Sequence, residues 1–182
     1  GIFCREKDTM ANIVLIGMPG CGKSTVGVLL AKALQMDFVD TDIVLQQQQG
    51  KKLQEIIDQV GNDAFLKMEE DCVRGLECDQ TVVATGGSVV YGKEAMRRLH
   101  ENGLVVYIRL PYEEIERRLS NLATRGVTLK KGQTLRNLYD ERIPLYEAEA
   151  DYTFEPEEGD VQETVLDLAR RLSARMEADN DR

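Results

Sequence analysis

Short apolar runs alternate along this chain with longer segments whose apolar residues recur at helical spacing. The runs of strand length, rich in β-branched residues, predict strands at 12–16, 38–39, 81–85, 104–110 and 152–154. The helical spacing predicts helices over 23–34, 43–49, 53–60, 62–78, 92–101, 112–120, 135–150 and 161–176. Pro144 predicts a kink or break within the helix 135–150. This alternation predicts one three-layer α/β domain with a parallel sheet over residues 11–176.

The stretch between the first predicted strand and the first helix carries a phosphate-binding pattern. It reads Gly17-Met18-Pro19-Gly20-Cys21-Gly22-Lys23-Ser24-Thr25 and fits G-x-x-x-x-G-K-[ST], the P-loop. We expect the backbone of Gly20, Cys21 and Gly22 to surround the phosphates of ATP, with Lys23 at the β/γ-phosphates, Ser24 on Mg²⁺ and Thr25 at the α-phosphate. The alternative is a glycine-rich turn that fits by chance, and the strand before it and the helix after it disfavour that alternative.

Composition narrows the possible partners. The 182-residue chain has a formal net charge of −9, which argues against nonspecific binding of nucleic acid. No apolar run approaches the length of a membrane span, and the four cysteines include no C-x-x-C pair. We therefore expect a cytoplasmic protein with free thiols. Residues 1–10 are expected to be a vector-derived remnant or a disordered N-terminus, and 177–182 a frayed tail.

Three further stretches follow the ends of predicted strands or helices. Asp40 and Asp42 lie two apart after the second strand, so both carboxylates can face one substrate hydroxyl and a magnesium ion, although Asp42 also fits the N-cap of the next helix. Gly86-Gly87 follows the third strand and predicts close backbone approach by a ligand, or a plain tight turn. The basic segment 121–132 predicts a mobile lid, or a solvated loop.

Taken together, these motifs resemble those of shikimate kinases. The resemblance rests on the P-loop, Asp40-Thr41-Asp42, the run from Gly61 through Phe65 to Glu69, Ala84-Thr85-Gly86-Gly87, and Arg142-Ile143-Pro144-Leu145-Tyr146, and it covers nearly all of residues 11–176. It implies a nucleoside-monophosphate-kinase-like fold with a five-stranded parallel sheet, an acceptor-binding helical region at about 42–70 and a lid. It also implies transfer of the ATP γ-phosphate to a hydroxyl of a small carbocyclic acid by a monomeric enzyme.

The resemblance also assigns roles to single residues. Asp42 looks like the aspartate that contacts the acceptor hydroxyl, and Asp40 like the one near magnesium. Gly86 and Gly87 look like substrate-contacting backbone, and Arg142 resembles the arginine that binds the substrate carboxylate. Arg118 looks like the adenine-stacking arginine. Arg125 looks like the lid arginine that enters the phosphate region, so Lys23, Asp42 and Arg125 form the expected catalytic set.

Departures from the family pattern cluster on the acceptor side. Leu66 stands where the family has an arginine in F-R-x-x-E, and a leucine cannot donate a hydrogen bond to a carboxylate. Ser88 stands where the family has a third glycine, which adds a side chain to the floor of the acceptor pocket. The lid reads Arg125-Gly126-Val127-Thr128 in place of R-P-L-L. The acceptor therefore stays open between shikimate and another small alcohol or amino alcohol such as homoserine, and a nucleotide-binding regulator is a second alternative.

Overall fold

The computed structural model describes residues 11–120 and 129–182. Two expectations lie outside the described residues: the nature of residues 1–10, and most of the lid, including Arg125.

A five-stranded parallel sheet forms the centre of the domain, in the order β2-β3-β1-β4-β5. Its strands are β1 (Asn12–Ile16), β2 (Asp37–Asp40), β3 (Thr81–Ala84), β4 (Gly103–Ile108) and β5 (Tyr152–Phe154). The central strand β1 is buried along its whole length, as its continuous apolar run predicts. The α/β fold class, the parallel sheet and the short edge strand β5 are thereby confirmed. Because all strands are parallel, their carboxyl ends meet at one edge, where the P-loop follows β1 and Asp40 ends β2.

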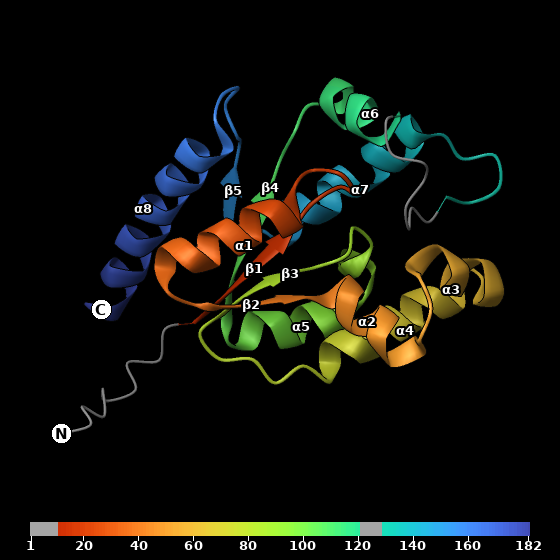
Figure 1. The fold of residues 1–182 in the computed structure, drawn as a ribbon, viewed down its shortest axis with the longest axis horizontal. Helices are drawn as coiled ribbons and strands as arrows, with labels where there is room; N and C mark the ends of the chain where they lie inside the picture. The colour runs from red at the N-terminus through yellow and green to blue at the C-terminus, as the bar shows by residue number, and fades with distance from the viewer. Residues whose placement is uncertain (1–10, 121–128) are drawn as a thin grey trace.

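Helices cover both faces of this sheet (Figure 1). On one face α1 (Lys23–Leu34) packs against α8 (Val161–Asn180), and on the other α5 (Lys93–Glu101) and α7 (Leu135–Glu149) contact β4. Each helix buries the apolar stripe that its spacing predicts, such as Val165, Leu168 and Leu172 of α8. The main core is therefore a three-layer one, with the sheet in the middle.

Three consecutive helices form a smaller unit at the carboxyl end of β2. They are α2 (Thr41–Gln49), α3 (Leu53–Val60) and α4 (Asn62–Arg74), and they enclose a separate small core of Leu45, Ile56, Ile57, Phe65 and Cys72. In Figure 1 this unit lies across from α6 (Tyr112–Ser120) and the beginning of α7, with the P-loop between them. It coincides with the expected acceptor-binding region.

Besides shifts of one or two residues at the ends of several other strands and helices, four features differ from the sequence prediction. Helix α2 begins at Thr41, and its N-cap is Asp40, whose Oδ1 accepts from the N–H groups of Asp42 and Ile43; the expected cap, Asp42, lies in the first turn. Helix α4 ends at Arg74 because the N–H of Gly75 bonds back into its last turn, four residues before the predicted end. Helix α8 continues to Asn180, beyond the expected end at Met176.

The fourth difference is that Pro144 does not break α7. Pro144 lacks the N–H that would bond to the carbonyl of residue 140, but it lies on the exposed side of the helix, where water can satisfy that carbonyl. A reciprocal capping box between Thr134 and Asn137 fixes the start of the helix. Packing of the opposite side, which buries Arg142 and Tyr146, holds the helix together across the proline.

Candidate active site

The P-loop depends on glycines for its shape. Gly20 and Gly22 have φ values of 77° and 97°, in the left-handed region that residues with a Cβ rarely adopt. At Gly17, with φ 149°, a Cβ would also lie 2.7 Å from the carbonyl oxygen of Ile108. The loop is therefore pressed against the end of β4, and its N–H groups lead into the N-terminus of α1, a favourable place for phosphate.

Lys23 opens α1 and curls back over this loop. Its ammonium is buried and donates to the carbonyl oxygens of Gly17, at 2.7 Å, and Met18, at 2.9 Å. The positive charge is thus held at the centre of the loop, where the β- and γ-phosphates of a nucleotide are expected. The contact of Lys23 with these phosphates stays a prediction of the sequence.

Ser24 and Asp40 meet beside the loop. The Ser24 hydroxyl donates to Asp40 Oδ2 at 2.5 Å, while Asp40 Oδ1 caps α2. Two hard oxygen donors at a phosphate site suit Mg²⁺, which is usually bound through one or two protein oxygens plus substrate phosphates and water. The described residues contain no cluster of three or more carboxylate, histidine or cysteine ligands. Ser24 and Asp40 therefore fit a metal that arrives with the nucleotide.

Two carboxylates converge on Gly86. A Cβ built there would lie 2.3 Å from Glu69 Oε2 and 2.8 Å from Asp42 Oδ1, so only a glycine fits between them. Burial raises the pKa of Asp42 to about 6, and the charge of Asp40 adds to this, whereas Lys23 opposes it. Burial likewise raises the pKa of Glu69 to about 7, with a further rise from Asp42. Asp42 is thus a candidate base with a pKa near neutrality.

Gly87 joins the P-loop to Arg142. A Cβ at Gly87 would lie 2.7 Å from Pro19 Cδ and 3.1 Å from Arg142 Nη1, so neither neighbour leaves room for a side chain. The carbonyl of Gly87 accepts from the Tyr146 hydroxyl at 2.5 Å, which ties α7 to the turn after β3. Arg142 itself is 1% exposed and lies over the ring of Tyr91, with its guanidinium carbon 5.4 Å from the ring centroid.

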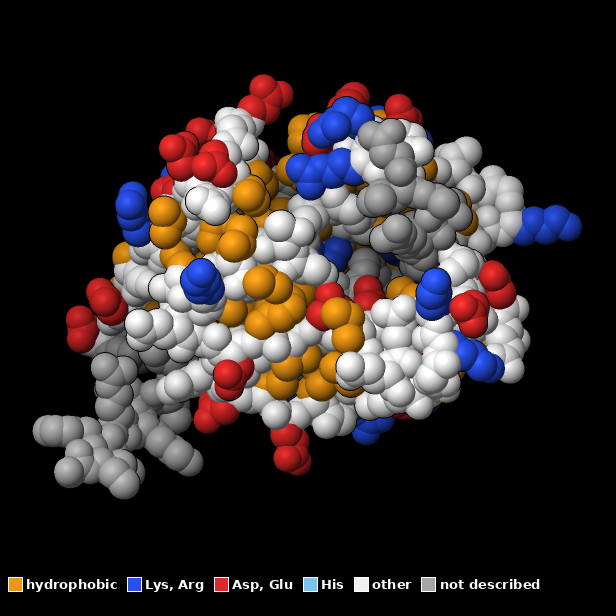
Figure 2. All heavy atoms as spheres, in the orientation of Figure 1, with side chains coloured by type: hydrophobic (Ala, Val, Ile, Leu, Met, Phe, Trp, Pro, Cys, Tyr) orange, Lys and Arg blue, Asp and Glu red, His pale blue; other side chains and the backbone are white. Residues whose placement is uncertain are grey.

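A cavity of about 440 Å³ opens on the other side of Arg142. Its lining combines three cations with two carboxylates and with Leu66 from α4; the cations are Arg142, Lys130 and Lys131, and the carboxylates are Asp63 and Glu141. The Asn62 amide donates to the carbonyl of Leu129 at 3.0 Å, so the segment that carries the two lysines is joined to the start of α4. In the space-filling view, a hollow between the two halves of the molecule holds acidic and basic side chains together (Figure 2). The cavity has the size for a small acid, and its cations exceed its carboxylates by one charge.

Arg118 lies over the P-loop from α6. Its Nη1 donates to the carbonyl of Gly20 at 3.2 Å, and its Nε donates to Glu114 at 2.8 Å. Glu114 therefore orients the guanidinium toward the loop, and hydrogen bonds from Arg117 and then Arg118 lower the pKa of Glu114 to about 2. The stacking of Arg118 on adenine stays a prediction of the resemblance.

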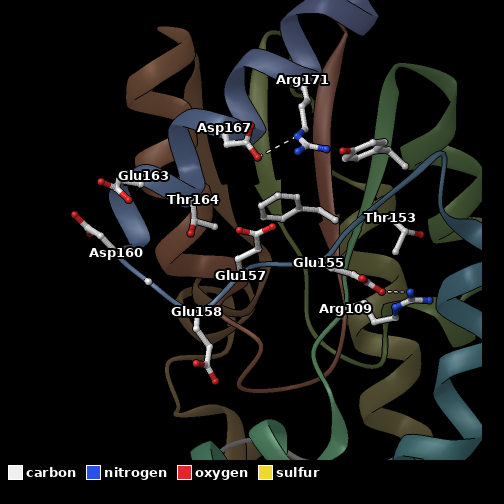
Figure 3. A pocket seen from close by; sticks show the side chains of 13 residues that line it. Arg109, Thr153, Glu155, Glu157, Glu158, Asp160, Glu163, Thr164, Asp167 and Arg171 are labelled. Atoms are coloured by element: carbon white, nitrogen blue, oxygen red, sulfur yellow. Dashed lines mark hydrogen bonds and ion pairs between the residues drawn. The ribbon is translucent and has the colours of Figure 1, made fainter.

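A second cavity, of about 640 Å³, lies between β5 and the start of α8 (Figure 3). Six carboxylates and two arginines line it, and in Figure 3 those arginines pair with two of the carboxylates, Arg109 with Glu155 and Arg171 with Asp167. The remaining acidic side chains would repel a triphosphate. This cavity therefore lacks the charge that a phosphate site needs, and the P-loop edge of the sheet holds the candidate site.

Comparison with known proteins agrees with this geometry. The family model described as shikimate kinase matches residues 19–173. The chain belongs to the shikimate kinase family. A shikimate kinase of Clostridium botulinum is 41% identical over 74% of this chain and 81% of its own length, and one of Vibrio parahaemolyticus is 36% identical over 90% and 97%. A solved shikimate kinase of Acinetobacter baumannii, in complex with shikimate, superposes with a TM-score of 0.79 at 30% identity, covering 94% of this chain and 96% of that one.

Membership of the shikimate kinase family makes the chain an ATP-dependent small-molecule kinase, and the relatives favour neither homoserine nor a regulatory role. The solved relative that contains shikimate supports a small-molecule acid as the class of substrate of this chain. No helix within residues 11–120 and 129–182 is long and apolar enough to span a membrane.

The structure brings together most of the residues that the sequence singled out. The P-loop, Asp40, Asp42, Gly86, Gly87 and Arg142 all lie at one edge of the sheet. Sequence reasoning gave no role in the site to Glu69, although the signal was present: a carboxylate that shares the buried side of α4 with Phe65 and Cys72 has no place there without a polar partner. It also gave no role to Lys130 and Lys131 beyond the lid.

Proposed function

We propose that this protein transfers the γ-phosphate of ATP to a hydroxyl of shikimate. The observation that carries the proposal is the arrangement around Gly86-Gly87. A carboxylate with a raised pKa, Asp42, lies beside the first glycine and a buried guanidinium, Arg142, beside the second, next to the P-loop. A small acid with a hydroxyl some distance from its carboxylate matches this pair, with the hydroxyl toward the phosphate and the carboxylate away from it.

In the proposed reaction, Asp42 orients the acceptor hydroxyl and takes its proton. The hydroxyl oxygen forms a bond to the γ-phosphorus while the bond from that phosphorus to the bridging β–γ oxygen breaks, so ADP leaves with the electron pair. Lys23 neutralises the charge that develops on the transferring group. Because positioning and electrostatics supply most of the acceleration in this chemistry, the close packing around Gly86 and Gly87 is itself part of the mechanism.

Mg²⁺ is the cofactor that we propose in addition to ATP. Ser24 and Asp40 would hold it, and when bound it supplies positive charge to the β- and γ-phosphate oxygens. The remaining nucleotide contacts that we propose are the backbone of Gly20, Cys21 and Gly22, the Thr25 hydroxyl, and Arg118 on the side of the base.

The acceptor carboxylate needs a second cation because Leu66 supplies none. Lys67 is not a substitute, since its ammonium is exposed and pairs with Asp71 at 2.8 Å. We assign the second charge to Lys130 and Lys131, which line the same cavity as Arg142. Together with Arg142 they would compensate for the missing arginine, and they would outweigh the two carboxylates of the same lining, Asp63 and Glu141.

An ADP-release assay tests the proposed reaction. With Mg-ATP, shikimate should give acceptor-dependent ADP release that exceeds the rates with homoserine and gluconate by at least tenfold. Mass spectrometry of the product should show one added phosphoryl group. ATP turnover that is independent of shikimate, or faster with homoserine, would refute the assignment.

Two further expectations remain proposals. We expect action as a monomer, in line with the resemblance, and light scattering at assay concentration checks it. Cys21, Cys72 and Cys78 are free thiols, which supports a reducing compartment such as the cytoplasm.

A further inference from the structure

The buried carboxylate of Glu69 has a hydroxyl partner that comes from a different element. Ser88 Oγ donates to Glu69 Oε1 at 2.7 Å, and both residues are almost fully buried, at 5% and 4% exposure. Ser88 precedes the short 3-10 helix Val89–Tyr91 as its N-cap residue, yet its side chain makes no capping bond to that helix. The hydroxyl is therefore committed to Glu69 rather than to local structure.

Glu69 lies between the two ends of the proposed acceptor site. Its other oxygen, Oε2, faces Gly86 beside Asp42, and the charges of Asp42, Arg142 and Lys23 all act on it. A carboxylate at this place has two possible arrangements. It can be held against the turn after β3, or it can rotate toward Arg142 and compete there with the carboxylate of the acceptor.

Position 66 is one turn before Glu69 on α4, on the same side of the helix. An arginine there could reach the Glu69 carboxylate, whereas Leu66 lines the cavity without a polar group. The two departures from the family pattern, Leu66 and Ser88, therefore meet at one side chain. A donor absent from α4 is matched by a donor present in the turn after β3.

We propose that Ser88 is a positioning residue that holds Glu69 away from Arg142 in place of an arginine at position 66. Positions 66 and 88 thus form a coupled pair that sets the affinity for the acceptor carboxylate. The proposal rests on the proposed function for its effect on the acceptor, while the bond between Ser88 and Glu69 can be tested without any turnover.

The kinetic test compares Ser88→Ala, Leu66→Arg and the double variant with the unchanged protein. Ser88→Ala should raise KM for shikimate about tenfold, since a hydrogen bond to a charged group is lost, while KM for ATP stays within about twofold and kcat changes little. Adding Leu66→Arg to Ser88→Ala should recover most of this loss, and Leu66→Arg alone should improve KM far less. Ser173→Ala on α8 is the matched control and should change neither constant. A KM for shikimate that is unchanged or lower in Ser88→Ala would overturn the proposal.

The second test uses thermal unfolding and needs no substrate. The single substitution Ser88→Ala should lower Tm by about 5 °C. In a protein that already carries Glu69→Gln, the same substitution should lower Tm by clearly less, because the charged hydrogen-bond acceptor is gone. Equal losses in the two backgrounds would refute the bond as the cause. If shikimate-dependent ADP release is absent from the unchanged protein, the proposed function fails, and this unfolding cycle still decides whether Ser88 holds Glu69.

Discussion

Gly86→Ala is the substitution whose effect follows most directly from the geometry of the site. The new Cβ would lie 2.3 Å from Glu69 Oε2, about 1 Å closer than the 3.4 Å at which ordinary contact begins, and 2.8 Å from Asp42 Oδ1. Both oxygens lie closer than a Cβ can approach, so both carboxylates must move. Overpacking of this kind costs about 1–3 kcal/mol of stability. Asp42 must move by about 0.6 Å to reach ordinary contact, and since a misplacement of about 1 Å can cost about 10²-fold, kcat/KM for shikimate should fall by at least about tenfold.

A matched glycine separates this effect from the general cost of adding a methyl group. Gly75, just after α4, has φ −81°, and a Cβ there would meet only carbonyl oxygens at 3.5 and 3.6 Å. Gly75→Ala should therefore leave kcat/KM unchanged and stability neutral or slightly higher. The measurements are Tm by calorimetry, kcat and KM by ADP release, and ATP affinity by titration calorimetry, which should be unchanged in both variants. Gly86→Ala with kcat/KM within twofold of the unchanged protein would refute the packing argument.

Three other results are expected from the same site. Lys23→Ala should lower kcat by about 10²–10³-fold, because a charge directed at the transferring phosphate is lost, and full activity in that variant would contradict the assignment. In a pH series, kcat/KM should rise through the pKa of Asp42, about 6, and continue through that of the neighbouring Glu69, about 7. The contribution of Asp42 to stability should fall between pH 3.8 and about 6, since the folded protein binds the proton more tightly than the unfolded chain; a flat kcat/KM profile from pH 5 to 8 would count against Asp42 as the base. The double substitution Lys130→Gln, Lys131→Gln should raise KM for shikimate about tenfold with little change in KM for ATP. Lys93→Gln, at an exposed lysine away from the cavity, serves as the control. Equal effects of the double variant and the control would exclude a carboxylate site at Lys130 and Lys131.

The nucleotide side of the site could be predicted almost completely from the sequence, because its parts are consecutive. The P-loop brings its glycines, Lys23 and Ser24 within one turn and the start of one helix, so their spacing in the chain fixes their spacing in space. The sheet was equally accessible, since each strand is a short apolar run between helices. Arg125 remains a prediction from the resemblance.

Local ambiguities account for the misplaced boundaries. Asp40 and Asp42 both fit an N-cap, and only the folded backbone shows that Asp40 accepts the two N–H groups while Asp42 turns inward toward Gly86. The apolar stripe after Arg74 continues through Leu76, so periodicity alone extended α4 too far. Pro144 was expected to kink or break α7. The helix is not broken there, because its buried side offsets the lost bond, and a kink stays a prediction.

The acceptor side could not be assembled from the sequence because its partners come from four separate segments. Glu69 and Ser88 are 19 residues apart, and nothing in either local pattern says that one side chain bonds to the other. Read alone, Leu66 is a lost donor and Ser88 an obstruction, and both argue against shikimate. Read together with Glu69, they are a relocated donor, and Lys130 and Lys131 add positive charge to the cavity that Leu66 lines. A departure from a family pattern therefore indicates a change of substrate only when no other side chain in the fold supplies the missing contact, and here two other segments supply it.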